Sequence, residues 1–282
     1  LRRIKIGGHR KALWSALMLG EIFQYLTTSC PKYVRAMGYL HGAIAIEARY
    51  KRCASAWQGH TDKSKALILE AADHCQNKKL AVVLGSGILS DIPLTELSTQ
   101  FERVELIDVV HLAKARKAAN AFDNVGLLSS EITGAAEILQ QHILMGGSGP
   151  IAVPTTTLSM IEDADLVVSA SVLSQLPLAL LETARTGPGW KDPVLVDFAR
   201  GILQAHLTAL DTAPGVVCLI TEVERQYYEA DEIVEIEDPL FGLNVGESDE
   251  EWLWEIAPPP ELDPRQGLRH RMIGNIITPS RP

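Results

Sequence analysis

The chain has 282 residues, of which 46% are hydrophobic and 22% charged, and its formal net charge is −9. This length suits one large α/β domain, or one domain with a sizeable appendage, and the composition is that of an ordinary globular protein with a core. Proteins that bind nucleic acid usually carry a strongly basic surface, so the acidic balance disfavours nucleic acid as a partner and favours a small-molecule substrate.

Cysteine usage and hydropathy bear on the compartment. The cysteines at positions 30, 53, 75 and 218 form no Cys-x-x-Cys pair, and their spacing fits no zinc site, so we expect inert thiols, no metal and a reducing compartment. The apolar stretch at 12–20 meets Glu21 without a convincing cleavage site, and no run is long enough to span a membrane. We therefore expect a cytoplasmic protein with no membrane span. Its oligomeric state is left open.

The first part of the chain, residues 8 to about 76, has a helical pattern. Leu13, Leu17 and Ile22 recur at helical spacing, and Pro31 marks a break. This pattern predicts a helical N-terminal cap at residues 1–76, followed by a second domain at residues 77–282.

From Leu80 onward, short apolar runs alternate with amphipathic segments. Such alternation predicts parallel strands joined by helical crossovers. We expect strands at 80–85, 103–108, 125–130, 165–170 and 215–221, with helices near 92–100, 111–121, 134–145, 173–185 and 191–211.

The most informative pattern links the first two predicted strands. The first strand ends in Gly85-Ser86-Gly87, and the second ends in a single carboxylate, Asp108, 21 residues after Gly87. Glycines let a ligand approach the backbone, and a carboxylate at the tip of the neighbouring strand accepts hydrogen bonds from ribose hydroxyls. The pattern predicts a nucleotide-type cofactor at the carboxyl ends of the strands.

Two other interpretations of this turn stay open. A dinucleotide fingerprint requires a third glycine where this chain has Ser90, and Pro93 removes one of the amides that a pyrophosphate needs. These two residues therefore disfavour an NAD-binding site. The turn can also be an ordinary strand-to-helix connection without a ligand.

With its correctly spaced carboxylate, this stretch resembles the class I, Rossmann-like methyltransferases that use S-adenosylmethionine (SAM). The resemblance implies a seven-stranded, mostly parallel α/β sheet with helices on both faces, completed by an antiparallel hairpin for which 252–256 and 272–277 are the candidates. It departs from the family at Val83, where an acid is frequent, and at Leu89, where a glycine is usual. Asp91 either replaces that acid or only favours a helix N-terminus.

The resemblance also implies roles for other strand ends. Residues following the third strand would meet the adenine, although Thr133 there is also an obvious helix cap. The tip of the fourth strand would face the methyl group and the incoming acceptor. The implied cofactor-binding residues are Gly85, Ser86, Gly87, Asp91, Asp108, Val109, Glu131, Ile132, Ser169 and Ala170.

Candidates for contact with the acceptor are less specific. Ser174 and Gln175 follow the fourth strand, His111 lies three residues past Asp108, and Trp57 belongs to the helical cap, where aromatic residues usually form core. A general base is not identified, and His60, His111 and His206 are candidates. The acidic segment 222–251 predicts a solvated face or a mobile loop, and whether it covers the site is left open.

The resemblance thus implies an enzyme that transfers a methyl group from SAM to a small or medium-sized molecule. An NAD-dependent oxidoreductase and a non-catalytic binding or assembly protein with the same fold are the alternatives.

Overall fold

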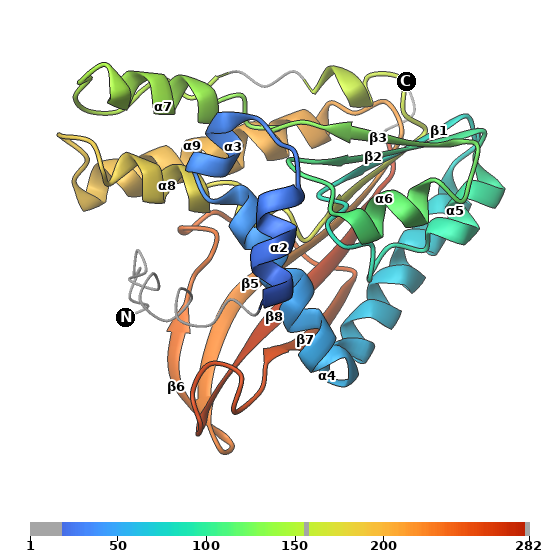
Figure 1. Cartoon of the computed structure of the whole chain (residues 1–282). Helices are drawn as coiled ribbons and strands as arrows, with labels where there is room; N and C mark the ends of the chain where they lie inside the picture. Colours follow the sequence, from blue (N-terminus) through green and yellow to red (C-terminus); the bar gives the residue numbers. More distant parts are fainter. Residues whose placement is uncertain (1–18, 155–157, 280–282) are drawn as a thin grey trace.

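The computed structural model describes residues 19–154 and 158–279, which form one eight-stranded sheet covered by helices (Figure 1). The strand order is β3-β2-β1-β4-β5-β8-β7, and β6 pairs with β5 outside this path. The strands are β1 (Leu80–Leu84), β2 (Arg103–Asp108), β3 (Val125–Ser129), β4 (Leu166–Ala170), β5 (Val216–Glu229), β6 (Glu232–Glu237), β7 (Glu250–Ala257) and β8 (Gln266–Ile277).

The first five strands run parallel, as the sequence predicts, and the last three pair antiparallel. Strands β1 and β4 are buried along their whole length, because helices cover both faces of this part of the sheet. The α-helices are α2 (Leu19–Thr27), α3 (Lys32–Ala36), α4 (Tyr39–His74), α5 (Leu94–Gln100), α6 (Ala113–Ala119), α7 (Ala136–Leu144), α8 (Leu178–Ala184) and α9 (Asp192–Asp211), with 3₁₀ turns η1 (Ser159–Ile161) and η2 (Leu173–Gln175).

Two hydrophobic layers hold the sheet. Helices α7, α8 and α9 pack on one face, where Val82 and Val167 meet Leu139, Leu180 and Leu203. The second half of α4 packs with α5 on the other face. The alternation of side chains along each strand therefore supplies a core on both sides.

The two halves of helix α4 pack against different parts of the protein. The helix is 36 residues long and bends at Cys53, whose backbone is not helical (φ −110°, ψ 16°), so that its blue and cyan halves form an open V in Figure 1. In the first half, Leu40 and Ile44 pack against Val110 beside the end of β2. The second half, which includes Ile68, belongs to the core of the sheet. The predicted cap thus shares one helix with the sheet domain, while the helical pattern at residues 8–18 lies outside the described residues.

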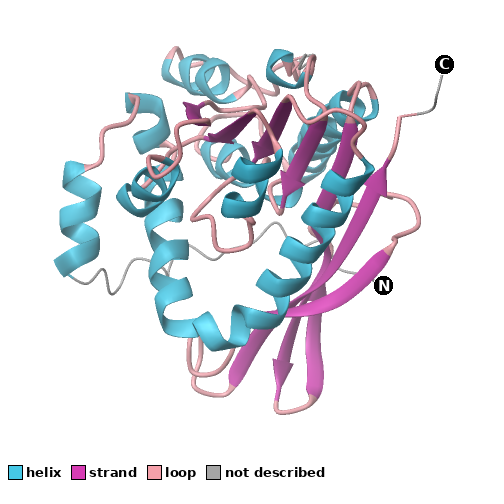
Figure 2. Cartoon of the chain, turned by 90° about the vertical axis from the view of Figure 1, so that its right-hand side faces the viewer, coloured by secondary structure: helices cyan, strands magenta, loops and turns pink. Residues whose placement is uncertain are grey.

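The expectation of an acidic loop at 222–251 is wrong for much of its length. Strand β5 continues to Glu229 and turns into β6, which brings the sheet to eight strands instead of seven (Figure 2). The acids misled because they alternate with apolar and basic residues, and several meet basic partners: Glu222 pairs with Arg225, and Glu224 pairs with Arg271. The predicted C-terminal hairpin is confirmed as β7 and β8.

Candidate functional site

The carboxyl ends of four parallel strands meet at one edge of the sheet. Leu84 at the end of β1 lies beside both Ile107 of β2 and Ser169 of β4, and Asp108 lies beside Ser129 of β3. The residues that the sequence predicts for the cofactor end or follow these strands. They are Gly85, Ser86, Gly87, Asp91, Asp108, Val109, Glu131, Ile132, Ser169 and Ala170.

The turn after β1 requires its two glycines for different reasons. Gly85 has a positive φ of 77°, and a side chain there would place its Cβ 2.4 Å from the Cβ of Val172. Gly87 also has a positive φ, 51°, but a Cβ there would have no neighbour closer than 3.9 Å. The first glycine is therefore needed for packing against the β4 loop, while the second presents bare backbone to open space.

Asp108 is joined directly to this turn. Its Oδ2 accepts a hydrogen bond of 2.7 Å from the amide of Gly87, and the amides of Gly85 and Ser86 donate to the carbonyl of Ile107. Desolvation raises the pKa of Asp108, while the Gly87 bond opposes that rise. A carboxylate in this position gains from further hydrogen-bond donors.

His111 is buried beside Asp108 rather than open to a substrate. Its Nε2 lies 3.2 Å from the carbonyl of Leu128, and this contact requires the proton to be on Nε2. Burial lowers the pKa of His111, so that the ring is neutral at pH 7. Its Nδ1 has no hydrogen-bond partner among the described residues.

Glu131 organises the loop after β3. Its carboxylate accepts hydrogen bonds from the amide and hydroxyl of Thr133 and from the amide of Ala136, the first residue of α7. Thr133 in turn accepts from the amide of Ala135, but Ala135 itself is the residue that precedes α7, so the prediction that Thr133 caps this helix is wrong. Ile132 is buried in the core.

Two serines at the end of β4 differ in their surroundings: Ser169 points into the core, and Ser171 has a strained backbone. The hydroxyl of Ser169 lies 3.0 Å from Nε2 of His206 on α9, and both side chains are buried. Burial lowers the pKa of His206 to about 4, and because its Nε2 is already engaged by Ser169, the structure gives this residue a core role. Ser171 has a positive φ of 53°, and its buried hydroxyl has no partner among residues 19–154 and 158–279. Such strain is often stored where a loop faces a ligand.

Asp91 lies close to a buried histidine of α4. Oδ2 of Asp91 is 3.7 Å from Nε2 of His60, while Nδ1 of His60 accepts a hydrogen bond of 3.1 Å from the indole of Trp252. Because Nδ1 is an acceptor, the ring carries a proton on Nε2, which has no hydrogen-bond partner among the described residues.

Trp57 joins α4 to β7. Its indole donates a buried hydrogen bond of 3.0 Å to the carbonyl of Ile256, and its ring meets those of Tyr50 and Trp254 edge-on. The structure thus gives Trp57 a packing role, and its contact with a substrate stays a prediction.

Two residues that the sequence analysis did not select, Glu222 and His270, lie beside Ser174 and Gln175. The amide of Gln175 donates to Oε1 of Glu222 at 3.1 Å, and Nδ1 of His270 is 3.9 Å from the same oxygen. Glu222 directly follows the apolar run of β5, where the sequence predicts that strand to end, and this position was a usable signal. His270 gave none, because only the pairing of β8 with β5 brings it there.

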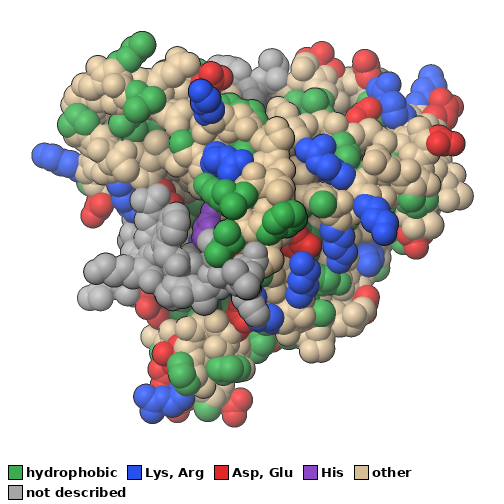
Figure 3. Space-filling view, viewed as in Figure 1, with side chains coloured by type: hydrophobic (Ala, Val, Ile, Leu, Met, Phe, Trp, Pro, Cys, Tyr) green, Lys and Arg blue, Asp and Glu red, His purple; other side chains and the backbone are tan. Residues whose placement is uncertain are grey.

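The surface around the site is unevenly charged. Basic side chains gather on the face that carries α4 and α6 (Figure 3), and Lys51, Arg52, Lys114 and Lys117 are exposed there. No helix in residues 19–154 and 158–279 is long and apolar enough to cross a membrane, and the same residues contain no cluster of three or more potential metal ligands.

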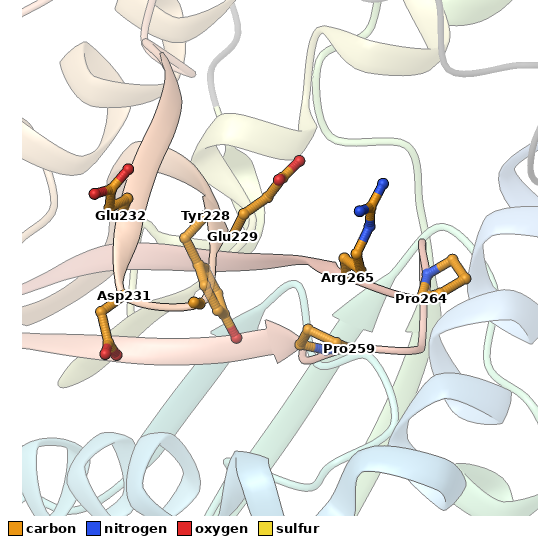
Figure 4. Close-up of a pocket in the computed structure, with 8 residues that line it drawn as sticks. Tyr228, Glu229, Asp231, Glu232, Pro259, Pro264 and Arg265 are labelled. Atoms are coloured by element: carbon orange, nitrogen blue, oxygen red, sulfur yellow. The ribbon is translucent and has the colours of Figure 1, made fainter.

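A pocket of about 780 Å³ lies away from these strand ends. Tyr228 and the acidic β5–β6 turn form one side, and Pro259, Pro264 and Arg265 from the β7–β8 loop form the other (Figure 4). None of its lining residues was predicted for the site.

No protein-family model matches this chain, and no curated protein matches its sequence. Among solved structures, N-methyltransferase NodS from Bradyrhizobium japonicum with S-adenosyl-L-homocysteine is 14% identical, with a TM-score of 0.35, over 77% of this chain and 86% of that one. The 1,6-didemethyltoxoflavin-N1-methyltransferase from Burkholderia thailandensis is 12% identical, with a TM-score of 0.34, over 83% and 89%. A SAM-dependent methyltransferase from Leishmania major is 13% identical, with a TM-score of 0.34, over 90% and 81%.

The fold is assigned from the chain's own topology. Five parallel strands in the order β3-β2-β1-β4-β5, followed by the antiparallel β8 and β7, form the Rossmann-like sheet that the resemblance to class I methyltransferases implies. The additional strand β6 is an extension at the edge of β5.

Proposed function

We propose that this protein is an enzyme that transfers the methyl group of SAM to a small or medium-sized molecule. The observation that carries the proposal is the direct hydrogen bond between the Gly87 amide and the Asp108 carboxylate at the carboxyl edge of the sheet. This bond joins a bare glycine turn to the ribose-binding acid that a nucleoside ligand requires.

The residues present fit the adenosyl and methionine parts of this cofactor. The hydroxyls of Ser86 and Ser171 are buried without partners in the described part of the chain, and a polar ligand at this edge would satisfy them. Asp108 would hold the ribose, Glu131 and Ile132 would border the adenine, and Asp91 would face the ammonium group. When bound, SAM supplies an activated methyl group, so the protein mainly has to position the acceptor and exclude water.

An NAD-dependent oxidoreductase is less well supported. Leu94–Gln100, the helix that follows the glycine turn, begins only after Pro93, which has no amide hydrogen to donate. A pyrophosphate binds to free amides at a helix N-terminus close to the turn. SAM has no phosphate and does not need that arrangement.

We also propose that the acceptor is a small molecule and that the enzyme works in the cytoplasm. The net charge of −9 supports a small-molecule acceptor over nucleic acid. The four cysteines at positions 30, 53, 75 and 218 are unbridged, which supports the cytoplasm as the place where the enzyme works.

Calorimetric titration of the purified protein with SAM, S-adenosylhomocysteine and NAD tests the proposal. We expect the two adenosyl sulfur compounds to bind at a ratio of one per chain and NAD to give no heat of binding. Binding of NAD without a response to S-adenosylhomocysteine would show the oxidoreductase alternative to be right. A protein that binds S-adenosylhomocysteine but never consumes SAM would be the non-catalytic alternative.

A further inference from the structure

A group of buried polar side chains lies where the end of β4 meets the middle of β5. The amide of Ser171 donates to the carbonyl of Ile220, which fixes the end of β4 to β5. Glu222 follows two residues later, and the pairing of β5 with β8 shifts register between Glu222 and Glu224. Such a bulge changes the direction in which a side chain points, and bulges of this kind occur often beside active sites.

Glu222 is a buried anion with one oxygen still available. Only 1% of the residue is exposed, and its Oε1 accepts hydrogen bonds from Arg225 at 2.8 Å and from Gln175 at 3.1 Å. Burial by itself would raise its pKa, but Arg225, His270 and a hydrogen bond from Ser174 outweigh burial and lower the pKa of Glu222 to about 2. Its Oε2 has no partner among the described residues.

His270 of β8 stands next to this carboxylate as a neutral base. The residue is 4% exposed, and neither ring nitrogen has a hydrogen-bond partner within residues 19–154 and 158–279. Burial lowers its pKa to about 4, although Glu222 opposes this effect. The other charged or titratable groups that act on it are Arg225 of β5 and His60 and Arg49 of α4.

Gln175 connects this buried pair to the outside. It is exposed on η2, between the end of β4 and α8, and its side-chain N–H already donates to Glu222. A ligand that brings its own N–H can therefore take the place of the Gln175 amide without leaving the carboxylate unsatisfied.

We propose that the acceptor of methyl transfer is an amino nitrogen, that Glu222 binds its N–H, and that His270 takes up the proton it loses. This assignment rests on the proposed function and names the acceptor class for the same site. It adds Glu222 and His270, from β5 and β8, to the residues expected at the strand ends.

The step balances without a further reactant. The lone pair of the neutral nitrogen forms the new N–C bond while the S–C bond of the bound methyl donor breaks, and the electrons of that bond stay on sulfur. The nitrogen then carries a positive charge that the Glu222 carboxylate stabilises, and its proton passes to an imidazole nitrogen of His270.

The charges favour nitrogen over oxygen as the reacting atom. A phenolic hydroxyl has an ordinary pKa of about 10 and has to lose its proton as it reacts, so it needs a base of higher proton affinity than this pair offers. A weakly basic amine is already neutral and attacks before it gives up its proton. A buried anion also stabilises the positive charge that arises on nitrogen and repels an anionic oxygen or sulfur.

The first test uses aniline and phenol, which differ only in the reacting group and are both neutral at pH 7. Each is titrated into the complex with S-adenosylhomocysteine while the imidazole resonances of His270 are followed by NMR, with His270→Gln for assignment. We expect aniline to shift these resonances saturably and phenol to leave them unchanged. Equal shifts from both compounds, or none from aniline, would overturn the proposal.

The second test measures formation of S-adenosylhomocysteine from SAM with aniline and related aromatic amines. Glu222→Gln should slow turnover roughly 10- to 100-fold, as expected for the loss of a charged hydrogen bond. His270→Gln, which keeps a polar side chain, should slow it by about 100-fold or more. Affinity for S-adenosylhomocysteine should stay unchanged in both variants.

Glu224→Gln is the matched control, because this neighbouring carboxylate on β5 pairs with Arg271 instead. It should leave turnover unchanged. Should Glu222→Gln fail to fold, His270→Gln decides the outcome. Wild-type turnover in that variant, or turnover of phenols with inactive amines, contradicts the proposal. If the wild-type protein does not bind S-adenosylhomocysteine at all, the proposed function itself is refuted.

Discussion

At the scale of single residues, the hydrogen bond that Asp108 accepts and the charge that it carries can be separated by mutation. This residue fixes the glycine turn through the amide of Gly87, and in the proposed function its carboxylate also holds the ribose. A neutral amide side chain can still accept the Gly87 bond with its oxygen but loses the charge.

Asp108→Asn should therefore keep the fold and weaken S-adenosylhomocysteine binding by roughly 10- to 100-fold, because hydrogen bonds to a charged group contribute about 1.5–3 kcal/mol. Calorimetry measures the affinity. The control is Glu105→Gln, which removes a carboxylate from the same strand before its end and should have no effect. Unchanged affinity in folded Asp108→Asn would remove this residue from the ribose site.

A pair of substitutions at Gly87 separates backbone strain from ligand approach. Valine is strained at a φ of 51°, whereas asparagine tolerates this region. Because an added Cβ meets only open space here, both variants should fold, as circular dichroism would show, and both should lose cofactor affinity. If Gly87→Asn binds normally while Gly87→Val does not, the turn needs glycine for its conformation and not for a ligand.

At the scale of elements, α4 ties the N-terminal helices to the extended C-terminal hairpin. Arg52 pairs with Glu261 and Lys63 pairs with Glu250, but these cations are exposed and such pairs contribute little. The buried bond from Trp57 to the carbonyl of Ile256 is the stronger connection.

Trp57→Phe should destabilise the protein by about 1–3 kcal/mol, because the buried carbonyl of Ile256 is left without its donor. Denaturant unfolding measures this loss. Affinity for S-adenosylhomocysteine should not change. A variant of wild-type stability that turns over an identified acceptor more slowly would instead place Trp57 in the acceptor site, as the sequence predicts.

At the scale of the whole molecule, buried histidines make stability depend on pH. The folded pKa of His206 is about 4, whereas its ordinary value is 6.5. Between these values the unfolded chain binds a proton that the folded protein does not, so stability falls as the pH falls. His270 acts in the same direction, and Glu222, whose pKa is lowered to about 2, adds a loss below its ordinary value of 4.5.

Lowering the pH from 7 to 5 should cost about 2 kcal/mol of unfolding free energy through His206 alone. His206→Gln, which keeps a hydrogen-bonding partner for Ser169, should show a smaller loss over this range. Urea unfolding at both pH values gives the two differences. If wild type and variant lose the same amount, His206 does not control the acid sensitivity.

The sequence by itself determined the parallel half of the protein. Short apolar runs separated by helical segments are local signals, and the spacing of Gly87 and Asp108 is fixed by one strand–helix–strand unit, so both could be predicted without knowing the rest of the chain. The five parallel strands and the crossover helices follow from such signals, whereas the C-terminal hairpin was expected only from the resemblance to class I methyltransferases.

Only the tertiary structure decided what β5 and β8 contribute. The acids after residue 221 resemble a solvated loop until antiparallel pairing supplies their basic partners. His270 lies beside Glu222, 48 positions away in the chain, because β5 and β8 run side by side, and Trp57 meets the carbonyl of Ile256 across 199 positions. Local patterns specify elements, whereas buried polar contacts between distant segments depend on strand register and helix packing, which the whole molecule sets.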